Sequence, residues 1–131
     1  MKRKTLSKYL VSIIFLIFLV NLLANKLYWY SSIWYLDMIM HFLGGFWLGL
    51  LFLYFFTPQN ISSKLIFKVF FFVFLVGTFW EVFEIFTYSI TTLYPFDYLD
   101  TISDLCFDLM GGGMAIFYFF GRIMFKTENK V

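Results

Sequence analysis

Four long apolar segments constrain the fold of this chain more than any other feature. They cover residues 9–24, 38–56, 69–88 and 104–125, and a helix needs roughly 20 residues to cross a bilayer. Hydrophobic residues make up 62% of the 131 residues and charged residues only 14%. A small soluble domain has too little interior to bury that much apolar surface, and disordered chains have the opposite composition. Lipid is therefore the expected solvent.

The apolar segments are continuous, whereas the strands of membrane barrels alternate between apolar and polar residues. Helices satisfy their own backbone groups in lipid. The sequence therefore predicts an all-α polytopic membrane protein, in which residues 1–131 form a single transmembrane domain of four helices. The first segment is the shortest and follows the basic residues Lys2, Arg3 and Lys4, so a cleaved signal peptide is the alternative. Its exit over residues 22–26 has no small-x-small cleavage pattern, which favours a retained span.

The basic residues indicate the orientation of the chain. Nine of the ten Lys and Arg residues lie on one side of the predicted spans, and Lys26 lies on the other; the nine are Lys2, Arg3, Lys4, Lys8, Lys64, Lys68, Arg122, Lys126 and Lys130. Cytoplasmic loops carry an excess of Lys and Arg. We therefore expect a multi-pass protein of the plasma membrane with both termini in the cytoplasm (N-in/C-in). Aromatic residues typical of the membrane interface mark the opposite side, among them Trp29, Trp34 and Tyr94.

Seven of the eight acidic residues lie on the outer side, together with the only histidine; the candidate site residues among them are Asp37, His41, Glu81, Glu84, Asp100, Asp104 and Asp108. Residues three or four positions apart share a helix face. Asp37 therefore shares a face with His41, Glu81 with Glu84, and Asp104 with Asp108. At 1.5 Å per residue, the groups on the three helices fall in one layer about 6–12 Å below the outer interface. The sequence predicts that these three faces meet.

Glycines continue each of these faces towards the membrane centre. The predicted packing positions are Gly44, Gly45, Gly77, Gly111 and Gly112. Small residues allow membrane helices to approach closely, so we expect these glycines to bring the acidic faces together.

Ordinary salt bridges cannot neutralise the acids, because the outer half of the chain has no Arg and only Lys26. Three explanations remain open: a bound cation, carboxyl groups that stay protonated because burial and like charges favour the neutral form, or a wet vestibule. One imidazole with several carboxylates suits a divalent metal ion such as Zn²⁺, Mn²⁺ or Fe²⁺; no other cofactor is expected. The predicted ligands are His41, Glu81, Glu84, Asp104 and Asp108, with Asp37 orienting His41 and Asp100 at the mouth. Glu81 or Glu84 could act as the catalytic general base on a metal-bound water.

Three motifs in order resemble the YjdF-like and VanZ-like groups of small integral membrane proteins. They are Asp37-Met-Ile-Met-His41-Phe42, Trp80-Glu81-Val-Phe-Glu84 and Asp100-Thr-Ile-Ser-Asp104-Leu-Cys-Phe-Asp108-Leu-Met-Gly111-Gly112. Met38 replaces a frequent Lys of the VanZ-like pattern, Glu84 replaces Gln, Asp108 replaces Asn, and no Arg precedes the last motif. These departures bring the chain closer to the YjdF-like pattern. The VanZ-like resemblance implies a link to glycopeptide resistance and the cell envelope, in a bacterial or archaeal-type plasma membrane.

The leading functional hypothesis is a metal-dependent enzyme or binding protein for a lipid-linked or cell-envelope substrate, and whether it is an enzyme stays open. The alternatives are a proton or cation transporter, or a structural subunit that pairs its acids with a basic helix of a partner. Transport is less favoured because the inner halves of the last three spans are rich in Leu, Phe and Ile. We expect membrane lipid and a lipid-linked substrate as partners and no nucleic acid, and a homo-oligomer stays open.

Overall fold

Helices make up nearly all of the computed structural model, which describes residues 2–91 and 96–128. They are α1 (Arg3–Lys26), α2 (Trp29–Ser32), α3 (Leu36–Phe56), α4 (Ser63–Thr91) and α5 (Tyr98–Glu128), and no strand occurs in these ranges. The four longer helices are long and apolar enough to cross a membrane. The predicted fold class, all-α with four membrane-spanning helices, is confirmed. Tyr94 and Lys130, which entered the orientation argument, lie outside the described residues.

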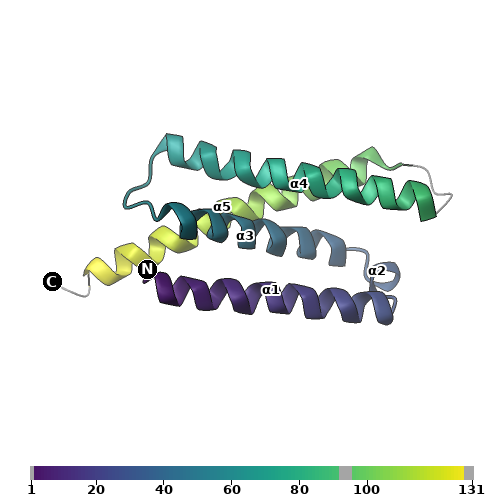
Figure 1. Ribbon diagram of the computed structural model, residues 1–131, viewed down its shortest axis with the longest axis horizontal. Helices are drawn as coiled ribbons and strands as arrows, with labels where there is room; N and C mark the ends of the chain where they lie inside the picture. The colour runs from purple at the N-terminus through teal and green to yellow at the C-terminus, as the bar shows by residue number, and fades with distance from the viewer. Residues whose placement is uncertain (1, 92–95, 129–131) are drawn as a thin grey trace.

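The four long helices lie side by side, and both ends of the chain lie at the same end of the bundle (Figure 1). Helix α3 occupies the centre: it packs most extensively against α5 and also contacts α1 and α4. Helix α1 packs on α3 and on the short α2. The predicted acidic site residues therefore sit on α3, α4 and α5, each of which contacts the other two.

Glycines place the backbones of α3 and α5 in direct contact. A Cβ atom at Gly45 would overlap the backbone of Asp108, and one at Gly111 would overlap the carbonyl oxygen of Phe42. One turn further along α3, a Cβ at Gly49 would lie 2.6 Å from the Cβ of Ala115. Only glycine leaves room for this approach, so these positions set the distance and the register between the two helices.

Gly44 does not share the packing role predicted for it. A Cβ atom built there would meet no heavy atom within 4 Å. Successive residues of a helix point about 100° apart, so Gly44 faces away from the contact that its neighbour Gly45 makes. Gly77 and Gly112 do lie at helix contacts: a Cβ at Gly112 would lie 3.0 Å from a methyl group of Val73 on α4.

An apolar layer fills the half of the bundle nearer the chain termini. Five of its side chains, contributed by α3, α4 and α5, are completely inaccessible: Leu50, Leu53, Val69, Val73 and Ala115. Leu6 and Leu10 of α1 join the same cluster. Among the described residues, every buried charged or ionisable side chain lies outside this layer, in the other half of α3, α4 and α5. The polar cluster thus lies next to this apolar layer, which we call the apolar floor.

Hydrogen bonds and aromatic packing attach α1 to its neighbouring helices. The indole N–H of Trp47 on α3 donates a hydrogen bond to the carbonyl oxygen of Leu10 at 2.9 Å. Near the chain ends, the rings of Tyr9 and Tyr118 pack edge to face with centroids 6.1 Å apart. At the opposite end of α1, the Tyr30 hydroxyl of α2 donates to Asn21 at 2.7 Å. The short α2, which was not predicted, is thereby tied to α1.

Candidate functional site

The imidazole of His41 lies among four carboxylates contributed by three helices. Its Nε2 atom is 3.7 Å from Glu81 Oε1 on α4, 3.7 Å from Asp104 Oδ2 on α5, and 3.9 Å from Asp37 Oδ1 on α3. Its Nδ1 atom is 3.3 Å from Asp108 Oδ1 on α5. The three acidic faces therefore meet around one ring, and each ring nitrogen has its own set of carboxylates. We call these five residues the His41 centre.

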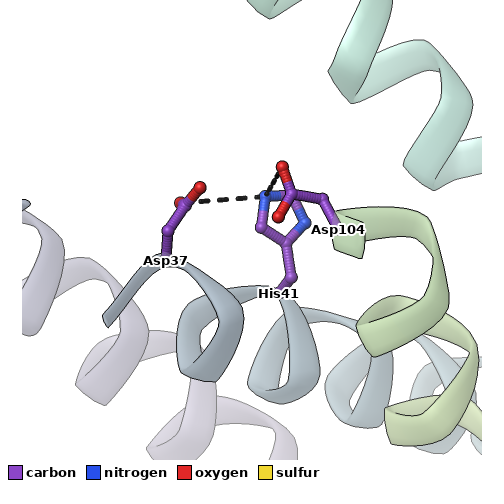
Figure 2. A group of neighbouring side chains, drawn as sticks. All are labelled: Asp37, His41 and Asp104. Carbon is purple, nitrogen blue, oxygen red and sulfur yellow. Dashed lines mark ion pairs between the residues drawn. The ribbon is translucent and has the colours of Figure 1, made fainter. Parts of the chain in front are cut away.

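Helix periodicity and helix contact together produce this geometry. Asp37 precedes His41 by one turn of α3, and Figure 2 shows its carboxylate reaching back to the ring nitrogen that Asp104 approaches from α5. Asp104 and Asp108 share one face of α5 because they are four residues apart. The contact of Gly45 with the backbone of Asp108 brings that face against α3.

The His41 centre has a buried interior and a more exposed rim. The exposed fraction is 9% for His41, 4% for Glu81, 2% for Asp104 and 5% for Asp108. The Asp37 side chain is 36% exposed. Near it, Glu84 is half-buried and Asp100, in the first turn of α5, is exposed. A molecule arriving from the end of the bundle opposite the chain termini would therefore meet Asp37 and Glu84 before the buried groups.

One buried oxygen of the centre has no hydrogen-bond partner. Glu81 Oε1 is inaccessible to solvent, and its ion pair with His41 Nε2, at 3.7 Å, is too long to be a hydrogen bond. In the described part of the chain, the carboxylates of the centre form ion pairs with His41 alone, and no Lys or Arg side chain reaches them. Leaving a buried polar group unpaired costs about 1–3 kcal/mol, and more for a charged group.

Gly77 makes room for the carboxylate of Asp108. A Cβ atom at Gly77 would lie 2.6 Å from Asp108 Oδ2. Gly77 precedes Glu81 by one turn of α4, so both face the same side of the bundle. Asp108 is therefore enclosed between the imidazole of α3 and the bare backbone of α4.

The distances at Nε2 are too long for hydrogen bonds and slightly longer than the spacing of metal ligands. They are 3.7–3.9 Å, whereas ligands that each lie about 2.0–2.2 Å from one metal ion are separated from one another by about 3–3.5 Å, so these side chains would move inward by a few tenths of an ångström to hold a cation. Two sets of ligand atoms lie within 4.8 Å of one another, Asp37/His41/Asp104 and His41/Glu81/Glu84. Imidazole and carboxylate ligands together suit Zn²⁺, Mn²⁺ or Fe²⁺.

The structure brings most of the predicted site residues together, but the carboxylate that approaches each nitrogen of His41 differs from the prediction. His41, Glu81, Asp104 and Asp108 lie in contact range, Glu84 lies beside His41 and Glu81, and Asp100 stays at the periphery. The sequence was interpreted with Asp37 as the partner that orients His41. In the structure Asp108 alone approaches Nδ1, and Asp37 lies on the Nε2 side with Glu81 and Asp104. Sequence reasoning also missed Gly49, although its spacing of four residues from Gly45 is a recognised packing signal.

Four apolar helices, three of which enclose a buried histidine–carboxylate cluster, define a polytopic integral membrane protein with an ionisable centre between its helices. Residues 1–124 match the family described as "Predicted membrane protein (DUF2238)", and the chain belongs to that family. The expectation of a small membrane protein family is thereby confirmed. No curated protein and no solved structure matches the chain.

Proposed function

We propose that this protein binds a divalent cation at the His41 centre. With this cation it acts as an enzyme or binding protein for a lipid-linked or cell-envelope substrate. The observation that carries the proposal is Glu81 Oε1, which is buried without a hydrogen bond and approaches His41 Nε2, as oxygens of Asp37 and Asp104 also do. Two sets of ligand atoms share His41, one with Asp37 and Asp104 and one with Glu81 and Glu84, so a divalent cation at Nε2 would bind one set directly and draw Glu81 or Asp104 in by a side-chain movement.

Charge balance supports the same proposal. An ionised acid inside the membrane costs about 2.5–3.5 kcal/mol at mid-depth on insertion scales, and the described residues supply no Lys or Arg to the carboxylates of the centre. Protonation is the competing explanation. A proton on either oxygen of Glu81 would neutralise that acid alone. A cation at Nε2 would also offset the charges of Asp37 and Asp104, whose oxygens approach the same ring nitrogen.

The layout of the centre is compatible with chemistry on a substrate at its rim. A bound divalent cation can activate water as a nucleophile or polarise a substrate oxygen. Glu84 is half-buried beside His41 and Glu81, so its carboxylate is in place to take a proton from a group near the cation. With the termini in the cytoplasm, this rim would open to the outer face of the plasma membrane, where lipid-linked envelope precursors and membrane lipid are accessible. The VanZ-like resemblance motivates this substrate class.

Transport of protons or cations remains the second candidate, because acids inside a membrane commonly form ion pathways. The apolar floor counts against it: Leu50, Leu53, Val69, Val73 and Ala115 are completely buried below the centre. The described helices therefore offer no polar route from the His41 centre to the end of the bundle that carries the termini.

Metal analysis tests the proposal directly. The protein is purified in detergent, dialysed against Zn²⁺, Mn²⁺ or Fe²⁺, and its metal content is measured by mass spectrometry. We expect stoichiometric metal in the wild type and a loss of most of it in His41→Ala and Asp104→Ala. Asp97→Asn is the matched control, because Asp97 lies at the same end of α5, where its side chain accepts hydrogen bonds from backbone N–H groups that asparagine can also accept. Equal, negligible metal in all four proteins would rule out the cation.

A further inference from the structure

We infer that Asp108 positions the imidazole of His41, so that the cation is bound at Nε2 together with Asp37, Glu81 and Asp104. This inference rests on the proposed cation centre and specifies its ligand atoms. It separates the carboxylates into one that orients the histidine and three that share the cation with it.

The two nitrogens of the ring have different surroundings. Asp108 Oδ1 lies 3.3 Å from Nδ1 and is the one carboxylate oxygen of the centre within hydrogen-bond range of the ring. A carboxylate accepts a hydrogen bond, so the Nδ1–H group donates to Asp108. A neutral imidazole carries one proton, and Nε2 then presents its lone pair to the oxygens of Glu81, Asp104 and Asp37 at 3.7–3.9 Å. This is how metal-binding histidines are commonly oriented.

Asp108 is also the carboxylate that neighbouring backbones hold in place. Its own backbone contacts α3 at Gly45, and its Oδ2 lies over Gly77 of α4. Asp37, by contrast, has a side chain that is 36% exposed. A group that orients a ring needs a fixed position, whereas a ligand at the rim can adjust when the cation enters. The packing therefore assigns the orienting role to Asp108 and a ligand role to Asp37.

The cation would join three helices. Its ligands would come from α3 through Asp37 and His41, from α4 through Glu81, and from α5 through Asp104. Asp37 and Asp104 already form one set with His41, whereas Glu81 belongs to a second set with His41 and Glu84, so the Glu81 side chain would move to join the cation. One nitrogen and three carboxylate oxygens form a ligand set that suits Zn²⁺, Mn²⁺ or Fe²⁺ better than Mg²⁺, which prefers an all-oxygen environment.

The single histidine of the chain makes the assignment measurable. Protein purified through a tag without histidine and labelled with ¹⁵N-histidine contains one pair of imidazole nitrogens. Their NMR signals are recorded in lipid nanodiscs without metal and after addition of ¹¹³Cd²⁺, whose coupling to ¹⁵N identifies the bound nitrogen. We expect a proton on Nδ1 in both states and cadmium coupling at Nε2. Cadmium coupling at Nδ1 would overturn the assignment but leave the proposed function intact. If neither nitrogen signal changed when cadmium was added, both the assignment and the proposed cation binding would be contradicted.

Variants of Asp108 separate positioning from a merely structural role. Asp108→Ala should weaken metal binding about 10–100-fold, as the loss of an orienting partner commonly does, and the ring should lose its fixed Nδ1–H signal. Asp108→Asn keeps an oxygen that can accept from Nδ1–H, so it should restore that signal and part of the affinity. The matched control Asp104→Asn should weaken binding while Nδ1 stays protonated. An unchanged Nδ1–H signal in Asp108→Ala would contradict the inference.

Discussion

Gly44 and Gly45 are neighbours on α3, but only Gly45 lies against another helix. A side chain at Gly45 would overlap the backbone of Asp108, whereas a side chain at Gly44 would meet nothing within 4 Å. Because Asp108 also contacts the ring of His41, the fit of Gly45 against α5 determines the geometry of the polar cluster. The pair Gly44 and Gly45 therefore offers a matched comparison within one helix.

We predict that Gly45→Ala destabilises the protein and Gly44→Ala does not. The added methyl group at Gly45 must push α5 away, and overpacking of this kind costs typically about 1–3 kcal/mol. At Gly44 the greater helix propensity of alanine is the main effect, worth up to about 1 kcal/mol of added stability. Reversible unfolding in the same detergent measures both free energies of unfolding. Equal stabilities of the two variants would show that the α3–α5 contact is looser than the structure indicates.

The sequence predicted which polar residues share a helix face, because that depends only on their spacing. Asp37 with His41 and Asp104 with Asp108 are examples, each four residues apart. The sequence could not predict which nitrogen of His41 faces which carboxylate. That depends on the register of α5 against α3 and on the side-chain rotamers, which are set by contacts between residues about 65 positions apart, such as Gly45 and Asp108.

At the level of helices, α1 differs from the other spans because it packs chiefly on α3. Its hydrogen bond from Trp47 to the Leu10 carbonyl joins the two helices within their apolar stretch. Much of the apolar surface of α1 is exposed, with Val11, Phe15 and Phe18 each more than 60% exposed, as expected for a surface that faces lipid. Its association with the bundle therefore depends on few contacts.

Trp47→Phe should weaken the attachment of α1. The substitution removes the indole donor and leaves a ring of smaller size, and hydrogen bonds between membrane helices contribute about 0.6 kcal/mol on average and up to about 1.7 kcal/mol. We expect a lower free energy of unfolding by about that amount, measured in detergent as for the glycine variants. Trp80→Phe is the control, since Trp80 is 56% exposed. A Trp47→Phe variant as stable as the control would show that α1 is held by other contacts.

Apolar length predicted the four long helices but not their ends or the short α2. Helix α4 begins at Ser63 and α5 at Tyr98, several residues before the predicted spans, because backbone hydrogen bonding continues through the polar residues at the interface. Helix α2 has four residues and follows Tyr28, which adopts a left-handed conformation with φ of 57°. A single turn of this kind leaves no periodic signal in the sequence.

For the whole molecule, the structure places both chain ends at one end of the bundle (Figure 1), and the distribution of basic residues predicts that this end is cytoplasmic. Cysteine labelling in intact cells tests the orientation in a Cys106→Ala background, since the chain has no other cysteine. A membrane-impermeant maleimide should label Lys26→Cys at the end of α1 and should label Gln59→Cys, between α3 and α4, only after the cells are broken. The reverse labelling pattern would show that the termini lie outside the cell.

The apolar layer below His41 predicts that the centre is reached from one side of the membrane only, and the distribution of basic residues predicts that this is the outer side. His41 follows Asp37 by four residues, or about 6 Å of helix, which is about a fifth of a bilayer core that is roughly 30 Å thick. A divalent ion moving that far crosses only a small part of the transmembrane voltage, equivalent to about 1 kcal/mol per 100 mV. With the proposed cation and the predicted orientation, occupancy would follow the ion concentration outside the cell and would change about fivefold for a 100 mV change in membrane potential.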